Sequence, residues 1–338
     1  MGNKIKLTIV AATLFITSLF GLTACGNAGA DADYKIAIVK YVDDASLNQI
    51  EDAIVAQLEA KGKELGVTFD IELYNGQADG TVLNQIAAEV VADEVDVVVP
   101  IATPAAVLMQ SATEDTKIKV VFSAVTDPVD AGLVASAEAP GANITGVSDA
   151  IDTDAIMNLI LLQNPDIKKI GLLYNKSEAS SSGAIADAKA FCKAKGIEVV
   201  EKTGTNVNEI QTAADVMVAD KVEAIFTPQD NTVMQAEMAI FEKFTEAKIP
   251  HYTGADSFAL NGAFLGYGVN YENLGTITGD MIVDVTVNGA DPAATPVKTL
   301  DDGIITVNTE TAEKLDIDYN MFKDHCTELR KTVTKKEF

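Results

Sequence analysis

The sequence predicts an α/β protein made of two doubly wound, Rossmann-like lobes. Apolar stretches of strand length alternate with amphipathic stretches of helix length, a pattern typical of a parallel sheet covered by helices on both faces. The same order of elements then occurs a second time along the chain. A length of 338 residues suffices for two domains of ordinary size, and an apolar content of 48% can fill two cores.

The first copy begins with the apolar residues 34–41, which predict a buried strand. Residues 46–64 carry apolar side chains at helical spacing, and Gly66 is expected to end this helix. The chain is expected to continue as a strand over 67–74, a helix over 83–91, and strands over 95–101 and 118–122.

The second copy repeats this order, with Gly196 in the place of Gly66. Residues 227–231 take the place of Thr103 and Pro104, directly after the third strand of each copy. The repeat length of a solenoid is much shorter than the separation between Gly66 and Gly196, so two copies of one domain are expected. The elements of this copy are strands over 169–176, 198–202 and 222–226 and helices over 183–195 and 208–219.

About three connections between the lobes are expected. Residues 141–148 form a short, loop-like link that permits hinge closure but not independent tumbling. Further elements follow the second copy, too many for one lobe: strands over 262–268 and 304–307 and helices over 270–288 and 319–331. The expected boundaries are residues 34–147 plus about 268–295 for the first lobe, and 148–267 plus about 296–338 for the second.

The N-terminus has the pattern of a targeting signal. Lys4 and Lys6 precede an apolar stretch over residues 7–22. The following Leu22-Thr23-Ala24-Cys25 resembles the box at which bacterial lipoproteins are cleaved and lipidated. We therefore expect residues 1–24 to be a signal peptide, Cys25 to carry a lipid, and residues 25–33 to tether an exported protein to the outer face of the bacterial cell membrane. A plain secretory signal or an N-terminal membrane helix is the alternative.

The charge of the chain excludes some ligands. A net charge of −25 makes nucleic acid a poor partner, because phosphate binding requires a basic surface. Arg330 is the single arginine, so a di-acid or a nucleotide would lack the bidentate partner it needs. His251 and His325 are too few for a histidine-rich metal site, and no metal or cofactor is expected. A monomer is expected.

Two cysteines besides Cys25 remain, Cys192 and Cys326. An exported protein is able to join them in a disulfide, but their separation in sequence does not determine their distance.

In an open α/β sheet the ligand binds beyond the carboxyl ends of the strands. In the first lobe these positions are residues 43–46, 75–76, 102–105 and 123–125. The candidate ligand residues among them are Ser46, Thr103, Pro104, Ala105, Ser123, Ala124 and Val125. In the second lobe the corresponding positions hold Asn175, Ser180, Ser181, Ser182, Gln229, Asp230, Asn231, Asp256 and Ser257. The aromatic residues Tyr41, Tyr174, Phe258 and Tyr267 lie in or just beyond strand ends and are expected to wall the cleft.

Three of these groups have a ligand role and a structural alternative. Thr103 and the N–H of Ala105 would meet a carboxylate, although a threonine before a proline is also an ordinary helix start. The serines at 180–182 exceed what capping a helix requires. Asp230 or Asp256 would take an amine, although either would also serve as a helix cap.

The chain contains none of the common catalytic motifs. Gly-x-Ser-x-Gly, the P-loop and His-Glu-x-x-His are absent, and Gly-x-Gly-x-x-Gly does not follow the first strand. A serine without a nearby histidine base is a poor nucleophile. The protein is therefore expected to bind a ligand without converting it, and not to be an enzyme.

Several stretches together resemble the substrate-binding lipoproteins of ABC importers, in the group with tryptophan- and tyrosine-binding members. They are residues 101–106, 121–128 with 131–134, 143–149, 171–175, 230–232 and 274–275. The resemblance covers nearly all of the chain after the signal. It implies a periplasmic-binding-protein type I fold with three crossings. It also implies capture of a small amino acid, expected to be aromatic (tyrosine, tryptophan or phenylalanine), and delivery to a membrane permease whose ATPase is a separate chain.

The sequence departs from this family in two places. Residues 43–47 lack a His-Pro pair found in many relatives, and Ser123 stands where alanine is frequent. Both places touch the expected cleft and leave the ligand open. The alternatives are a membrane-tethered sensor or adhesin on the same fold, a protein that binds another small solute such as a sugar or purine, and an enzyme on the same scaffold.

Overall fold

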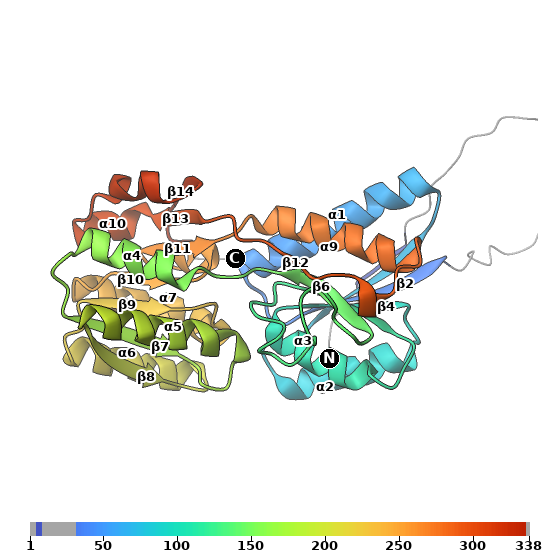
Figure 1. Cartoon of the computed structure of the whole chain (residues 1–338), viewed down its shortest axis with the longest axis horizontal. Coiled ribbons are helices and arrows are strands. Elements are labelled where there is room, and N and C mark those ends of the chain that lie inside the picture. Colours follow the sequence, from blue (N-terminus) through green and yellow to red (C-terminus); the bar gives the residue numbers. More distant parts are fainter. Residues whose placement is uncertain (1–4, 9–31, 336–338) are drawn as a thin grey trace, which may run out of the picture.

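The protein consists of two α/β lobes that lie side by side (Figure 1). The computed structural model describes residues 5–8 and 32–335. Each lobe contains a seven-stranded, mostly parallel sheet. The predicted fold class is confirmed by this arrangement.

The first lobe is built on strands β2 to β6, which run parallel. They are β2 (Tyr34–Lys40), β3 (Phe69–Asn75), β4 (Val97–Ile101), β5 (Lys119–Ser123) and β6 (Ile144–Ser148), flanked by β1 (Ile5–Thr8) next to β3 and β12 (Lys298–Thr299) next to β6. Helices α1 (Ala45–Leu65) and α9 (Tyr271–Thr286) cover one face, and α2 (Gly80–Ala92) and α3 (Thr103–Thr113) cover the other (Figure 1).

The second lobe has the same strand order with an extension at one edge. Its sheet runs β14-β13-β11-β10-β9-β7-β8. The strands are β7 (Lys169–Tyr174), β8 (Glu198–Thr203), β9 (Ala224–Thr227), β10 (His251–Thr253), β11 (Leu265–Gly268), β13 (Ile304–Asn308) and β14 (Glu328–Thr332). The helices are α4 (Thr153–Gln163), α5 (Ala179–Lys195), α6 (Val207–Ala219), α7 (Asn231–Glu246), α8 (Asp256–Leu260) and α10 (Thr309–Leu315), with a 3₁₀ turn at Tyr319–His325. A second 3₁₀ turn, Pro292–Ala294, packs against β5 and β6 of the first lobe.

The repeat predicted from the sequence is present in the structure. The order β3-β2-β4-β5-β6 of the first lobe corresponds to β8-β7-β9-β10-β11 of the second. Gly66 ends α1 with φ 70°, and Gly196 ends α5 with φ 69°. This left-handed conformation favours glycine, because a side chain would meet the backbone.

The strands are buried on both faces. In β2, Ile36 and Ile38 pack beneath α1 and α9, whereas Ala37 and Val39 pack beneath α2 and α3. Continuous apolar runs are therefore required here, because neither side of a doubly wound sheet meets water.

Three crossings connect the lobes, at residues 149–152, 269–270 and 300–303. The expected loop over 141–148 is wrong, since β6 pairs with β5 in the first lobe. Gly146 permits this pairing, because a Cβ there would lie 2.2 Å from the carbonyl oxygen of Phe122. The third crossing follows the expected boundary near 295, because β12 still pairs with β6.

The predicted helix over 319–331 is also wrong. Tyr319–His325 forms a 3₁₀ turn, and Glu328–Thr332 is strand β14, parallel to β13. Pairing with β13 satisfies the backbone hydrogen bonds of this segment and places Leu329 against the core of the second lobe. The tertiary environment therefore overrides the local helical pattern.

The sequence predicts a signal peptide, and it leaves open whether the two other cysteines form a disulfide. Cys25 and most of the predicted signal peptide lie outside the described residues. Cys192 and Cys326 are free thiols. Among residues 5–8 and 32–335, none of the helices is long and apolar enough to cross a membrane.

The contact between α1 and α9 offers a test of the first lobe's packing. A Cβ on Gly275 would lie 2.5 Å from the carbonyl oxygen of Ile50 and 2.7 Å from Cβ of Ala53. We expect Gly275→Val to lower the free energy of unfolding by about 2 to 3 kcal/mol, because overpacked helices must separate. Chemical denaturation measures this change.

Gly80→Ala is the matched control, because a Cβ on Gly80 meets no atom within 4 Å. Its effect is expected to stay within about 0.5 kcal/mol. Equal effects of the two substitutions would contradict close α1–α9 packing.

Candidate functional site

A cavity lies between the lobes, where the carboxyl ends of both sheets face each other. The empty space within it, counted with its open mouth, is about 440 Å³. This size suits a small solute. Its lining consists of Asp44, Ser46, Leu47, Ala102, Thr103, Ala124, Thr126, Asp149, Ser180, Gln229, Asp230, Asn231, Met234, Ala255, Ser257, Phe258 and Tyr271.

Many residues at the predicted strand ends line this cavity. They come from α1, the β4 and β5 ends, and the loops before α5, α7 and α8. These predicted residues are Ser46, Thr103, Ala124, Ser180, Gln229, Asp230, Asn231, Ser257 and Phe258.

The other candidates lie beside or behind the lining. Ala105 and Val125 belong to the core beneath α2 and α3, with Pro104 in the first turn of α3. Ser123 bonds to Thr278, Asn175 and Ser181 bond to Asp230, Ser182 bonds to the Ala179 carbonyl, and Asp256 accepts a bond from Ser46. Of the aromatic candidates, Tyr41 packs against the first lobe's cores, Tyr174 donates to the Glu201 carboxylate, and Tyr267 belongs to the core beneath α4 and α5.

The sequence places Asp44 and Ala102 at strand ends without selecting them as candidate ligand residues. It missed six lining residues: Leu47, Thr126, Asp149, Met234, Ala255 and Tyr271. Leu47, Thr126 and Ala255 adjoin predicted residues, so a wider window around each strand end would have found them. Asp149 begins the first crossing, and Tyr271 is the first helical residue after the second; at such junctions periodicity carries no signal. Met234 lies in the first turn of α7.

Four lining side chains each bury a polar atom that has no hydrogen-bond partner in the described part of the chain. We call them the polar quartet: Asp44 Oδ2, Thr103 Oγ1, Asp149 Oδ1 and Tyr271 Oη. Buried polar atoms are normally paired, and leaving one unpaired costs about 1 to 3 kcal/mol. Their concentration around one cavity indicates a site for a polar ligand.

Two carboxyl groups of the quartet are only partly bonded by the protein. Asp44 caps α1, and its Oδ1 accepts hydrogen bonds from the N–H groups of Ser46 (3.0 Å) and Leu47 (3.2 Å). Asp149 follows β6, and its Oδ2 accepts a hydrogen bond of 2.9 Å from Gln229 Nε2. Burial raises the pKa of Asp44 to about 6 and that of Asp149 to about 7. Each carboxyl therefore lacks a compensating positive charge.

Asp230 was one of two candidates to bind the ligand's amine, but protein groups donate hydrogen bonds to both of its carboxylate oxygens. Its Oδ1 accepts from the N–H of Val233 (2.9 Å), and its Oδ2 accepts from Asn175 N–H (2.6 Å) and the Ser181 hydroxyl (2.7 Å). The neighbouring Glu178 accepts from further N–H groups of the same helix. This geometry supports the capping alternative, because protein donors occupy both oxygens.

The amino end of α3 opens on the cavity. Ala102 occupies the cap position with φ 81° and ψ 150°, and within the described residues no side chain caps this helix. Thr103 was expected to be the cap, but it is the first helical residue and its hydroxyl belongs to the polar quartet. Free N–H groups at a helix start attract anions. This end of the cavity therefore suits a carboxylate.

The charges of the lining are one-sided. Asp44, Asp149 and Asp230 contribute carboxyl groups, and among the described residues neither lysine nor arginine lines the cavity. Lys40, at the end of β2, bonds to Asn48 and Glu51 instead. A bound molecule with a positive group would offset this imbalance.

The lobes are closed on each other. The Ser46 hydroxyl donates to Asp256 Oδ1 (2.6 Å), and the Thr126 hydroxyl donates to Gln229 Oε1 (2.6 Å). One apolar cluster also continues across the cleft, joining Leu47 of the first lobe to Phe258 of the second. The described conformation is therefore a shut cleft.

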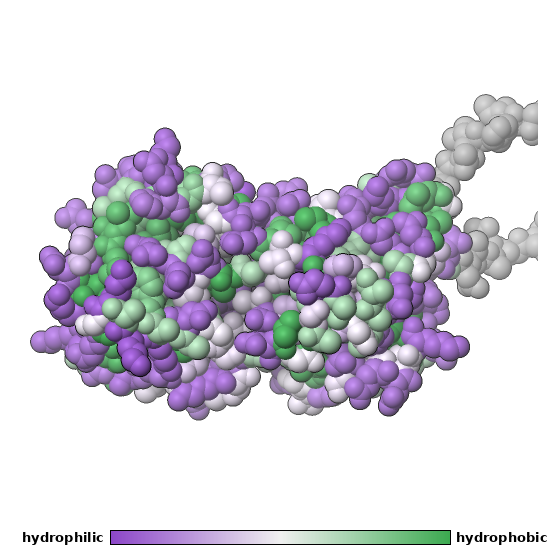
Figure 2. Space-filling model, viewed as in Figure 1, coloured by the Kyte–Doolittle hydropathy of each residue, from purple (hydrophilic) through white to green (hydrophobic). Residues whose placement is uncertain are grey.

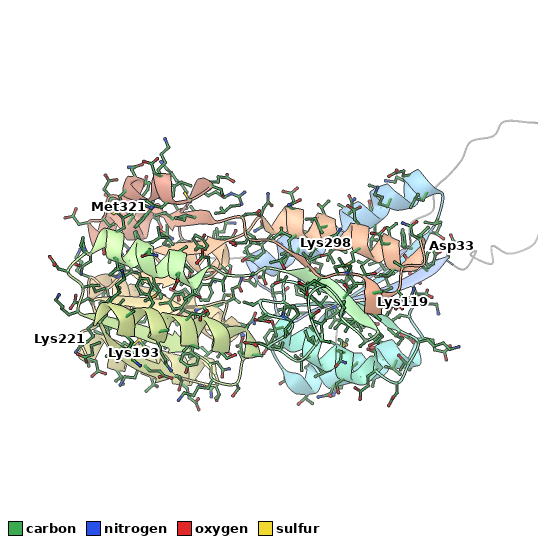
Figure 3. The ribbon with its side chains drawn as sticks, viewed as in Figure 1. Asp33, Lys119, Lys193, Lys221, Lys298 and Met321 are labelled. Carbon is green, nitrogen blue, oxygen red and sulfur yellow. The ribbon has the colours of Figure 1, made fainter. Side chains whose placement is uncertain are left out.

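A second hollow lies far from this cleft. It is lined by residues that include Tyr34 and Lys119, and Figure 3 shows Lys119 at the end of the first lobe remote from the second. This hollow lies at the amino ends of the strands, where open α/β sheets do not place ligands. Hydrophilic side chains dominate the outer surface shown in Figure 2.

The pKa of Asp149 predicts how stability depends on pH. Burial raises it from 3.8 to about 7, so between these values the folded state holds a proton that the unfolded state has lost. Stability from this group is therefore greatest at low pH and is lost as the pH rises through about 7.

We expect ligand-free protein to lose stability from about pH 5 to about pH 8 relative to Asp149→Asn, by more than about 1 kcal/mol. Denaturant titrations at each pH measure the difference, in which the contributions of Asp44 and Asp230 cancel. Parallel pH profiles for the two proteins would show that Asp149 is ionised throughout.

Replacing Asp230 tests its role as a cap. Asp230→Ala is expected to reduce stability by about 2 to 4 kcal/mol, because it removes three hydrogen bonds from buried donors. Ser182→Ala is the control, because Ser182 is exposed and its hydroxyl, among the described residues, donates to the Ala179 carbonyl oxygen alone. Unchanged stability together with a large loss of ligand affinity would instead make Asp230 a ligand contact.

Comparison with known proteins agrees with this geometry. The model of a protein family with the description ABC transporter substrate binding protein matches residues 35–322. The tyrosine-binding protein of Clostridioides difficile (strain R20291) is 32% identical over 325 residues, which cover 94% of this chain and 93% of that protein.

Two solved structures are similar over most of the chain. An ABC domain from Streptococcus pneumonia in complex with L-Trp is 32% identical, with a TM-score of 0.80 over 88% of this chain and 99% of that one. A ligand-free, open substrate binding protein with adhesive properties from Clostridium difficile is 33% identical, with a TM-score of 0.68 over 89% of this chain and all of that one. The higher score against the liganded structure agrees with the shut cleft. The chain belongs to the family of ABC transporter substrate binding proteins.

Proposed function

We propose that the protein binds an aromatic amino acid between its lobes as the solute-binding component of an ABC importer. The observation that carries this proposal is the polar quartet, which surrounds a cavity that also has an apolar wall. Relatives that are named as tyrosine-binding or that hold L-Trp support the choice of ligand.

The ammonium group of the ligand would bind Asp149 and Asp44. Each has a buried oxygen in the polar quartet, and both carboxyl groups gain from a positive neighbour. An ammonium donates three hydrogen bonds, so it can reach both oxygens and a hydroxyl. Asp230 and Asp256 fit this role less well, because protein donors already bond to them.

The carboxylate would bind at the amino end of α3. The hydroxyl of Thr103 and the uncapped N–H groups there offer donors without a cationic side chain. The aromatic side chain would lie against Leu47, Met234 and Phe258, which form the apolar part of the lining. Methionine sulfur and phenylalanine rings both make favourable contacts with aromatic groups.

Transport would follow from lobe closure. A ligand that contacts both lobes stabilises the closed form, and a membrane permease would recognise that form. The permease and its ATPase are the expected partners. We also propose export and a lipid anchor on Cys25, on the strength of the signal-like N-terminus, and a monomeric state in solution.

One observation favours an adhesive role as a second candidate. A relative with 33% identity is described as a substrate binding protein with adhesive properties. Tethering at the cell surface would suit either role. Loss of amino-acid uptake on deletion of the gene supports import, whereas loss of attachment to host cells with normal uptake supports adhesion.

A ligand screen tests the proposed function. Residues 26–338 are expected to melt at a higher temperature with tyrosine, tryptophan or phenylalanine at millimolar concentration, because ligands that bind the folded state stabilise it by mass action. Differential scanning fluorimetry with a dye measures the shift. If a sugar or purine raises the melting temperature and none of these amino acids does, the aromatic assignment is wrong.

Asp149→Asn tests the proposed ammonium site. The substitution removes a charge-assisted hydrogen bond, so affinity for the amino acid is expected to fall about 10- to 100-fold. Asp154→Asn is the control, because Asp154 is exposed on α4. Isothermal titration calorimetry measures both. Equal affinities of the two variants would place the ammonium elsewhere.

A further inference from the structure

We propose that Gln229 is a positioning residue that couples the ligand's amine to closure of the lobes. This inference rests on the proposed function and extends it to how binding at Asp149 is transmitted across the cleft. Gln229 lies between β9 and α7 in the second lobe, and its side chain bonds to the first lobe and to a crossing at once.

The amide of Gln229 uses its full hydrogen-bonding capacity as a donor. Its Nε2 donates to the carbonyl oxygen of Asp149 (2.9 Å) and to Asp149 Oδ2 (2.9 Å). Its Oε1 accepts from the hydroxyl of Thr126 (2.6 Å). Exchanging the amide oxygen and nitrogen would set oxygen against both Asp149 oxygens, so these partners determine its orientation.

The backbone around Gln229 leaves it little freedom. A Cβ on Gly254 would lie 2.9 Å from the backbone nitrogen of Gln229 and 2.6 Å from Cδ1 of Ile151. The loop before α7, the first crossing and the end of β10 therefore meet at one point. On the opposite side, Ser148 donates to the Thr126 carbonyl oxygen (3.0 Å), which ties Thr126 to the residue before Asp149.

One of these contacts, the hydrogen bond between Thr126 and Gln229, depends on the lobes being closed. Thr126 belongs to the first lobe and Gln229 to the second, so their hydrogen bond exists only in the closed form. Gln229 holds Asp149 Oδ2, which leaves Oδ1 for the ligand. An ammonium on Oδ1 favours the ionised carboxylate, a better acceptor for Gln229. The closed form is thereby stabilised through Gln229 and Thr126.

The other bond across the cleft provides a comparison. Ser46 donates to Asp256, and neither residue bonds to Asp149 or Gln229. Both bonds favour closure, but only the one through Gln229 is linked to Asp149. Ser46 also donates its backbone N–H to Asp44, the other proposed amine ligand, and Ser46→Ala keeps that bond because it removes only the hydroxyl. Removing the Ser46 bond should therefore weaken closure without changing how much the amine contributes.

The test compares L-tryptophan with indole-3-propionic acid, which lacks the amine. Since the chain contains no tryptophan, excitation of the indole reports each ligand directly. The affinity ratio of the two ligands measures the contribution of the amine. Gln229→Leu is expected to lower this ratio at least about 10-fold, and Thr126→Val about 2- to 10-fold, mainly through faster dissociation. Ser46→Ala keeps the N–H bond to Asp44 and is expected to weaken both ligands by the same factor, so that the ratio stays the same.

Small-angle scattering of the ligand-free proteins supplies a second readout. Thr126→Val and Ser46→Ala are both expected to increase the radius of gyration, because each removes one bond across the cleft. Thr126→Val keeps the shape of the side chain, so it preserves the test if Gln229→Leu does not fold.

An unchanged ratio in Gln229→Leu and Thr126→Val, with wild-type protein binding L-tryptophan, would overturn the coupling and leave the proposed function intact. Failure of wild-type protein to bind any aromatic amino acid would overturn the proposed function itself. An equal fall of the ratio in Ser46→Ala would show that closure alone, and not Gln229, determines the amine's contribution.

Discussion

Closing this cleft buries carboxyl groups without any cation from the described lining, and the rest of the site depends on that constraint. Burial raises the pKa of Asp44, Asp149 and Asp230. The protein compensates them unequally. Asp230 has donors on both oxygens, whereas Asp44 and Asp149 each keep one oxygen in the polar quartet. A zwitterion that brings an ammonium here offsets the burial that closure requires.

Backbone strain at the strand ends belongs to the same arrangement. Ala102 and Ala124 line the cavity with positive φ values of 81° and 52°. Such conformations cost an alanine about 1 to 3 kcal/mol and are retained mainly at functional sites. At Ala102 the strain turns the chain directly from β4 into α3. The amino end of that helix therefore opens on the cavity, and within the described residues no side chain caps it.

The sequence predicted the parts of the fold that depend on residues close together along the chain. Alternating apolar and amphipathic stretches located most strands and helices of both lobes, and Gly66 and Gly196 marked equivalent helix ends. The errors fell on β6 and β14. Both are strands of five residues that are stabilised by pairing with β5 and β13, and local pattern does not report such partners.

By itself, the sequence determined the two-lobed class and the strand ends that supply Ser46, Thr103 and Gln229 to the cavity. Only the tertiary structure decided which carboxyl groups remain for a ligand. In sequence, Asp230 and Asp149 are both aspartates near loops. The donors to Asp230 Oδ2 include Asn175, 55 residues away, and the donor to Asp149 is Gln229, 80 residues away. The bond between Asn175 and Asp230 exists only once the second lobe has folded, and the bond between Gln229 and Asp149 only once the first crossing packs against that lobe.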